Sequence, residues 1–184
     1  GRTPYISSGT WSLLGVERGA ANTSDKAREL DYSNEGSVNG NFRLQKNIMG
    51  LWMIQQVRHE LNDKYDFSTL ASLARINRVS DVVDVNDDRF LAPTSMAKSY
   101  AKSLTALEEL TGEKYDTLNI IGGGSKNEFL NELTAEYTGK RIVTGPAEGT
   151  AIGNAMMQMV GAGELASVAE GRELIRKSFD IREL

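Results

Sequence analysis

Hydrophobic and polar positions near the start of the chain predict a β-hairpin. Residues 4–8 (Pro-Tyr-Ile-Ser-Ser) and 11–16 (Trp-Ser-Leu-Leu-Gly-Val) are rich in strand-forming side chains, and Gly9 and Thr10 between them form the predicted turn. We expect Trp11 to belong to the core. Residues 18–41 are polar and rich in Gly, Asn and Ser, which indicates a loop region.

Two segments in the middle of the chain have helical periodicity. Residues 42–44 predict a short strand that leads into a helix from about Ile48 to Leu61, which has a broad apolar face. Residues 68–75 predict a second, shorter helix, which either Asp66 or Ser68 would cap.

The pattern continues with a predicted strand over residues 82–85 and a loop over residues 86–90. Apolar side chains then recur at helical spacing from Ala97 to Leu110, which predicts an amphipathic helix. Gly112 is placed to terminate this helix.

The clearest unit is a strand–helix–strand–helix series in the last third of the chain. Residues 118–121 and 141–144 are the predicted strands, and residues 125–138 and 150–160 are the predicted helices. This order implies two parallel strands joined by a right-handed crossover. We therefore expect one domain with an antiparallel front half and a βαβα back half.

Composition narrows the possible chemistry. The chain has 184 residues, of which 40% are hydrophobic and 25% are charged. Its net charge of −4 argues against a protein that binds nucleic acids or membrane surfaces. It has no Cys, which excludes disulfides, thiolate nucleophiles and sulfur-ligated zinc. No apolar run approaches the ~20 residues of a membrane span, so we expect a cytoplasmic protein. The single His59 lies off the apolar helix face and is predicted to be a solvated surface residue.

Gly122, Gly123 and Gly124 form the first candidate site. Glycines between a strand and a helix expose backbone N–H groups near the positive end of the helix dipole and let a phosphate or ribose approach. Ser125 and Glu128 predict a capping box at the start of the helix. The spacing matches neither a Walker loop nor a dinucleotide fingerprint, so a tight turn without a ligand remains the alternative.

Three other segments carry polar side chains that could meet a ligand. Thr10 lies at the hairpin turn, where a hydroxyl and the adjacent N–H groups can contact a phosphate. Asn47 lies near the predicted start of a helix, where capping is the simpler interpretation. Asp87 and Asp88 could form a metal pair, but a local ion pair with Arg89 is the favoured interpretation.

Taken in order, these stretches resemble the C-terminal domain of the FGGY family of carbohydrate kinases. The resemblance rests on Ser-Ser-Gly-Thr-Trp-Ser-Leu (7–13), Lys-Asn-Ile-Met-Gly-Leu-Trp (46–52), Asn-Asp-Asp-Arg-Phe (86–90), Gly-Gly-Gly-Ser-Lys-Asn (122–127) and Gly-Pro-Ala-Glu (145–148). It implies an α/β fold, that of an actin-like or ribonuclease H-like ATPase domain, with a mixed sheet and flanking helices. This nucleotide-binding domain would span residues 1–184.

The resemblance also implies a reaction and the residues that serve it. The γ-phosphoryl group of MgATP would be transferred to the 1-hydroxyl of L-rhamnulose in rhamnose breakdown, so ATP and Mg²⁺ are expected. The residues expected at the nucleotide are Thr10, Gln55, Gly122, Gly123, Gly124 and Asn127. Asn47 would contact the sugar.

Two features depart from the family pattern. The family's general-base Asp lies just before the hairpin segment, and no Asp of this chain matches it. The chain begins without Met and enters a strand at once, so we expect a piece of a longer protein that lacks the N-terminal sugar-binding domain and is inactive alone. The family also carries a longer stretch before Met96 and Ala97. Either this member is naturally shortened or residues are missing there, and we favour the second explanation because only Thr94 and Ser95 signal a helix start.

Two alternatives remain open at the level of the sequence. One is a kinase for another deoxyketose, such as L-fuculose. The other is a non-catalytic actin-like module that binds a nucleotide and acts through a partner. Neither nucleic acid nor membrane is expected as a partner, whereas the chain's own N-terminal domain is.

Overall fold

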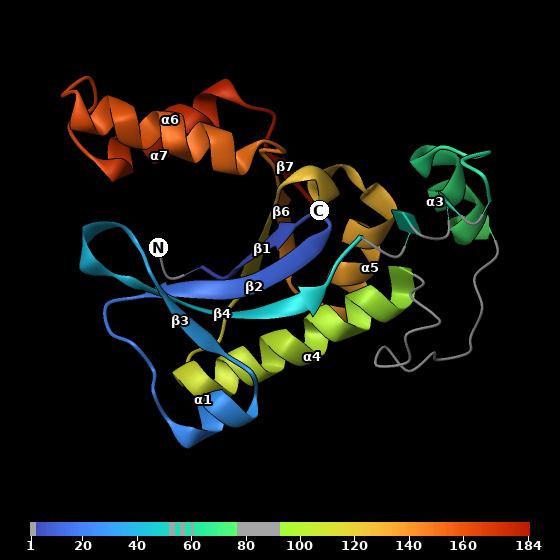
Figure 1. The fold of residues 1–184 in the computed structure, drawn as a ribbon, viewed down its shortest axis with the longest axis horizontal. Helices are drawn as coiled ribbons and strands as arrows, with labels where there is room; N and C mark the ends of the chain where they lie inside the picture. The colour runs from blue at the N-terminus through green and yellow to red at the C-terminus, as the bar shows by residue number, and fades with distance from the viewer. Residues whose placement is uncertain (1–2, 52–53, 56–57, 60, 77–92) are drawn as a thin grey trace.

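The computed structural model describes residues 3–51, 54–55, 58–59, 61–76 and 93–184. Over these residues it forms a seven-stranded mixed sheet in the order β3-β4-β2-β1-β5-β6-β7 (Figure 1). The strands are β1 (Tyr5–Ser8), β2 (Trp11–Arg18), β3 (Ser33–Gly36), β4 (Phe42–Met49), β5 (Thr117–Ile121), β6 (Arg141–Thr144) and β7 (Arg182–Glu183). The helices are α1 (Asp25–Glu29), α3 (Phe67–Ile76), α4 (Pro93–Thr111), α5 (Glu128–Thr138), α6 (Gly149–Gly161) and α7 (Val168–Ser178), with 3₁₀ segments η1 (Val38–Gly40) and η2 (Gly123–Lys126).

The front half of the sheet is antiparallel, as the sequence predicts. β1 and β2 form the expected hairpin, with Ile6 opposite Leu14, and β4 pairs with β2 along its whole length. The region predicted as loop over residues 18–41 is wrong in part, because it contains α1 and the edge strand β3. Both are short and polar, so they lack the apolar periodicity that marks the other elements.

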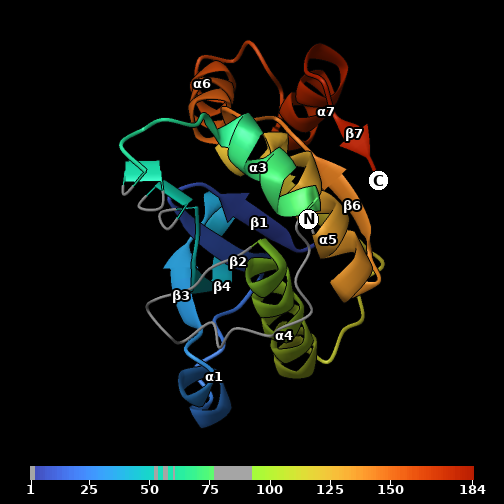
Figure 2. The same ribbon diagram turned by 90° about the vertical axis from the view of Figure 1, so that its right-hand side faces the viewer.

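The back half is parallel and confirms the predicted crossover. β5 lies beside β1 with Ser7 opposite Ile121, and β6 lies beside β5, both in parallel register. Helix α5 connects β5 to β6. Since β1 and β5 run in the same direction, the turns that follow Ser8 and Ile121 leave the sheet at the same edge. Figure 2 shows the strands between helices α6 and α7 at the top and helices α4 and α1 at the bottom.

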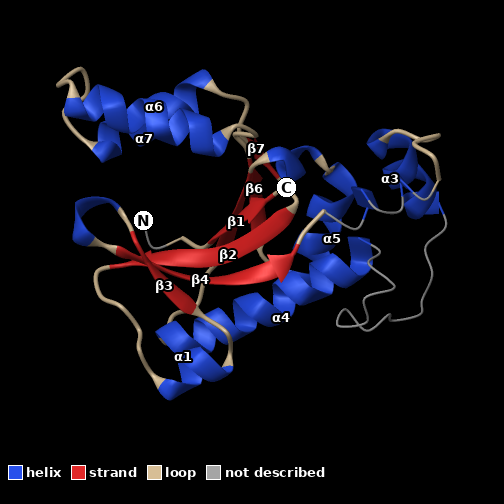
Figure 3. Ribbon diagram, viewed as in Figure 1, coloured by secondary structure: helices blue, strands red, loops and turns tan. Residues whose placement is uncertain are grey.

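The main core lies between the sheet and helices α4 and α5. Figure 3 shows α4 running along one side of the strands. Side chains of β1, β2, β5 and β6 form one buried cluster with side chains of α4 and α5. The principal buried side chains are Ile6, Leu14, Val16, Leu44, Tyr100, Leu104, Leu107, Leu118, Ile120, Leu130, Leu133 and Ile142. Helices α6 and α7 lie on the other side of the sheet in Figure 1 and contribute little to this core.

Two sequence-based predictions fail around the exit of the hairpin. The helix expected from Ile48 is wrong at its start, because β4 continues to Met49 and Asn47 lies in that strand opposite Leu13. Trp11 is not a core residue, since 58% of its surface is exposed. In both cases the pairing of β2 with β4 decided the outcome. It keeps Asn47 in a strand, and its register sets the face of the sheet on which Trp11 lies.

Helix ends follow the sequence signals more closely. Asp66 caps α3, because its Oδ1 accepts a hydrogen bond of 2.7 Å from the backbone N–H of Thr69. Gly112 follows α4 with a φ of +67°, as predicted. Helix α4 begins at Pro93, three residues before Met96, and proline is a favoured first helical residue, so the helix does have a start signal. The predicted strand at residues 82–85 and loop at residues 86–90 lie outside the described residues.

A buried carboxylate joins α4 to the loops that flank β5 and β6. Glu108 accepts hydrogen bonds from Lys114 (2.6 Å), Lys140 (2.9 Å) and the backbone N–H of Tyr115 (3.3 Å). Burial raises the pKa of Glu108, but the hydrogen bonds from Lys114 and Lys140 outweigh it, so the pKa lies below its ordinary value. The charged form of Glu108 therefore stabilises the fold.

We expect Glu108→Gln to lower the free energy of unfolding by about 2 kcal/mol at pH 7, because two charged hydrogen bonds are lost. The difference from the wild type should be full above the ordinary glutamate pKa of about 4.3 and disappear as the pH falls through the lowered pKa. Urea unfolding at pH 7 and at pH 3 measures both. The control is the exposed neighbour Glu109→Gln, which should change stability by less than about 0.5 kcal/mol.

Candidate functional site

The residues that follow β4 pack against the hairpin turn and fix its position. A Cβ on Gly50 would lie 2.6 Å from the carbonyl oxygens of Gly9 and Thr10, so only glycine permits this approach. The Leu51 backbone N–H also donates a hydrogen bond of 2.8 Å to the Gly9 carbonyl. Thr10 is thereby held at the exposed tip of the turn.

The three consecutive glycines have different structural roles. A Cβ on Gly122 would lie 2.7 Å from the Ser8 carbonyl oxygen, and one on Gly124 would lie 2.0 Å from the Ser8 Oγ. Both glycines are therefore required for the turn to pack on β1. Gly123 has no atom within 4 Å of its Cβ position, so its backbone faces open space. A ligand that approaches this turn meets Gly123.

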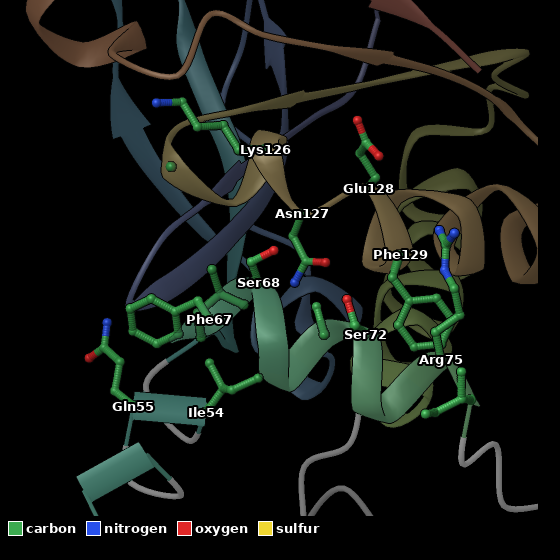
Figure 4. A pocket seen from close by; sticks show the side chains of 14 residues that line it. Ile54, Gln55, Phe67, Ser68, Ser72, Arg75, Lys126, Asn127, Glu128 and Phe129 are labelled. Carbon is green, nitrogen blue, oxygen red and sulfur yellow. The ribbon is translucent and has the colours of Figure 1, made fainter. Parts of the chain in front are cut away.

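The start of the following helix differs from the prediction. Ser125 lies within the 3₁₀ segment η2 and does not cap α5, so the capping box of Ser125 and Glu128 is wrong. Asn127 is the N-cap, because its Oδ1 accepts a hydrogen bond of 3.1 Å from the backbone N–H of Leu130. The extra 3₁₀ turn moves the cap by two residues, from Ser125 to Asn127. Asn127 thus projects its amide into the cavity beside it (Figure 4).

A cavity of about 730 Å³ lies between η2 and helix α3, and we call it the α3 cavity. One part of its wall is apolar, and the rest carries amides, hydroxyls and charges, as Figure 4 shows. The apolar residues are Leu51, Ile54, Phe67, Ala71, Ile76 and Phe129, and the others are Gln55, Ser68, Ser72, Arg75, Gly123, Lys126, Asn127 and Glu128. Its volume and mixed lining suit a nucleoside, whose base is flat and apolar and whose ribose is polar.

A second cavity of about 550 Å³ lies at the hairpin turn, and we call it the hairpin cavity. Its lining includes Gly9, Trp11, Asn47, Gly122 and Gly123. Gly123 therefore lines both cavities. Trp11 and Asn47 are exposed and lie on neighbouring strands, on the sheet face opposite α4. A ligand that arrives from solvent can reach both side chains.

The predicted site residues thus fall into two groups. Gln55, Gly123 and Asn127 line the α3 cavity, whereas Asn47, Gly122 and Gly123 line the hairpin cavity. Gly124 is buried beneath the turn, and Thr10 lies at the tip of the hairpin between two residues that line the second cavity. The predicted metal pair, Asp87 and Asp88, lies outside the described residues.

The sequence did not identify the α3 wall of the larger cavity. The cavity is lined by Phe67 and Arg75 of α3, and also by Phe129 of α5 and Lys126 of η2. An amphipathic pattern predicts helix α3, but periodicity alone does not say that one face of a helix lines a cavity. Only Lys126 had a usable signal, since it lies two residues after the glycines.

A layer of buried hydroxyl groups supports the two turns. Ser12 and Tyr100 are fully buried and their hydroxyl oxygens lie 2.6 Å apart. Burial raises the pKa of Tyr100, so its phenol stays neutral. Ser8 lies opposite Ser12 in the hairpin and directly beneath Gly124. The contact between Ser12 and Tyr100 ties helix α4 to the edge of the sheet from which both turns emerge.

Two further observations concern the remaining candidates. His59 is exposed over 75% of its side chain and lies 3.6 Å from Asp63, as expected of a surface histidine. Within the described part of the chain, no group of three or more His, Asp or Glu side chains could hold a metal ion. Among the same residues, no helix is long and apolar enough to span a membrane.

Comparison with known proteins gives consistent results. The model of the FGGY family of carbohydrate kinases, C-terminal domain, matches residues 92–162. A rhamnulokinase of Halalkalibacterium halodurans is 39% identical over 210 residues, which cover 98% of this chain and 45% of that protein. A rhamnulokinase of Bacillus subtilis is 38% identical over 209 residues, which cover 97% of this chain and 43% of that protein. The chain thus spans less than half the length of these curated relatives. Both alignments are longer than the chain itself, so these relatives carry residues that it lacks.

Solved structures of sugar and polyol kinases share the fold. A ligand-bound xylulose kinase from Lactobacillus acidophilus superposes with a TM-score of 0.69 at 15% identity, over 94% of this chain and 41% of that protein. A glycerol kinase from Plasmodium falciparum, solved with ADP, gives a TM-score of 0.69 at 13% identity, over 97% of this chain and 42% of that protein. The expected actin-like fold with a mixed sheet and flanking helices is confirmed.

The different roles of the glycines lead to a stability prediction. Gly124→Ala should lower the melting temperature by several degrees, because its Cβ would overlap the Ser8 side chain. Gly123→Ala, which enters open space, should leave it within about one degree. Calorimetry of both variants tests this, and equal losses would contradict the assignment.

Proposed function

Since the chain belongs to the FGGY family of carbohydrate kinases, as the C-terminal domain, we propose that it is the nucleotide-binding half of a kinase that uses MgATP to phosphorylate the 1-hydroxyl of L-rhamnulose. The observation that carries the proposal is the position of Gly123, which is open and lines both cavities. A nucleotide in the α3 cavity would direct its phosphates past Gly123 to the hairpin turn. The identity of 38–39% with rhamnulokinases supports L-rhamnulose as the sugar.

Each residue has a defined task in this proposal. Gln55 and Asn127 offer amide groups to the base and ribose in the α3 cavity, whose apolar wall would exclude water from the base. The backbone at Gly123 and the hydroxyl of Thr10 would hold phosphate oxygens. Asn47 would hydrogen-bond the sugar at the hairpin cavity. Phosphoryl transfer depends mainly on positioning and electrostatic stabilisation, for which such groups suffice.

The remaining parts of the reaction would come from outside these residues. Mg²⁺ in such sites keeps water and phosphate oxygens as its main ligands, so we propose that it enters bound to ATP. The general-base Asp and much of the sugar site would belong to an N-terminal domain. This domain would close on the hairpin turn and complete the cleft, and the chain alone would then be inactive. Use of MgATP is consistent with a cytoplasmic enzyme.

The first test is ADP release by the full-length protein with L-rhamnulose, L-fuculose, D-xylulose and glycerol as acceptors. We expect L-rhamnulose to be preferred at least tenfold in kcat/KM, with the 184-residue chain inactive under the same conditions. A preference for L-fuculose would correct the sugar. Failure with every acceptor, together with nucleotide binding, would favour a non-catalytic module.

A second test separates the two cavities. Thr10→Val should raise the KM for ATP about tenfold through loss of one hydrogen bond to a charged phosphate, with the sugar KM unchanged. Asn47→Ala should raise the sugar KM about tenfold and leave the ATP KM unchanged. Steady-state kinetics with each substrate varied in turn measures both. If each variant impaired both substrates equally, the assignment of roles would be wrong.

A further inference from the structure

Helix α3 forms one wall of the α3 cavity but is weakly attached to the core. It contains no buried residue, and the core cluster contacts it through the partly buried Ala74. Pairs of neighbouring residues one helical turn apart face the cavity, namely 67–68, 71–72 and 75–76. A helix whose inner face lines a cavity gains little from burial, so other contacts must fix its distance from the opposite wall.

An ion pair provides such a contact at the C-terminal end of α3. The Arg75 guanidinium donates hydrogen bonds of 2.6 and 2.7 Å to the two carboxylate oxygens of Glu132 on α5. Its central carbon also lies 5.5 Å from the centre of the Phe129 ring, which is buried in the core. Among the ion pairs between described residues, this is the one that joins α3 to another element.

The two partners relate differently to the cavity. Arg75 and Phe129 line it, at the end away from Gln55 and Phe67 in Figure 4. Glu132 does not line this cavity and instead borders a neighbouring one. We therefore expect Glu132 to influence a ligand in the α3 cavity chiefly through Arg75, which it binds directly, and through the position of α3.

We propose that the Arg75–Glu132 pair, braced by Phe129, sets the width of the α3 cavity and thereby the affinity for the base and ribose of the nucleotide. Glu132 is then a positioning residue for the nucleotide, although it does not touch it. This inference rests on the proposed function, because it requires a nucleotide in the α3 cavity. Both side chains are about half exposed, so their loss should not prevent folding.

The test is a double-mutant cycle with Glu132→Gln and Arg75→Gln, made in the full-length protein. Isothermal titration calorimetry measures the Kd for MgADP, and steady-state kinetics measures the KM for ATP and for the sugar. We expect Glu132→Gln to raise the Kd for MgADP and the KM for ATP about fivefold and to leave the sugar KM unchanged. In the Arg75→Gln background, Glu132→Gln should have no further effect.

The matched control is Glu35→Gln, which removes an ion pair of similar exposure with Arg43 on the far edge of the sheet. It should leave the Kd for MgADP unchanged. Hydrogen exchange provides a second readout, because the amides of residues 67–76 should exchange faster in Glu132→Gln and not in Glu35→Gln.

The outcomes separate this inference from the proposed function. If the wild type binds MgADP and Glu132→Gln binds it equally well, the positioning role is overturned and the proposed function stands. The positioning role is also overturned if Glu132→Gln still weakens binding in the Arg75→Gln background. If the wild type binds no MgADP, both proposals are overturned.

Discussion

The close packing of the glycine turn on Ser8 is the contact on which the candidate site depends. β1 and β5 are parallel neighbours although more than 100 residues separate them in the sequence, so the hairpin turn and the glycine turn leave the sheet side by side. Gly122 and Gly124 approach the Ser8 backbone and side chain more closely than any Cβ would allow. This approach brings the open backbone of Gly123 next to the hairpin, where a bound phosphate could meet both turns.

The same contact explains how the two cavities are related. Gly123 lies at their junction, with α3 and the start of α5 on one side and the ends of β1, β2 and β4 on the other. The hairpin side is rigidly built, since Gly50 packs directly under the turn and Tyr100 links Ser12 to helix α4. On the α3 side, helix α3 has no buried residue and reaches the core through Ala74.

Similarity to known proteins and the geometry of the site support each other at different levels. Structures only 13–15% identical to the chain share its fold, so the arrangement of sheet and helices is kept when most side chains differ. Identity of 38–39% is found with rhamnulokinases, and the motif residues that suggested the family, such as Gly123 and Asn127, line the cavities.

The sequence by itself determined the elements whose signals are local. Signals from neighbouring residues were enough for three parts of the fold. These are the hairpin around Gly9 and Thr10, the amphipathic helix before Gly112 and the βαβα unit around the three glycines. Their order along the chain also indicated the parallel crossover, and the motifs within them suggested the family. Local signals failed where two capping residues competed, since Asn127 rather than Ser125 caps α5.

Only the tertiary structure decided which of these elements meet. Asn47 is in a strand because its partner, Leu13, lies in a strand more than 30 residues earlier, and this pairing overrides a local helical pattern. Trp11 is exposed because its position in the hairpin register places it on the open face of the sheet. The α3 wall and the Arg75–Glu132 pair depend on contacts between residues 57 positions apart. Periodicity states that a helix has two faces, whereas packing alone decides what each face meets.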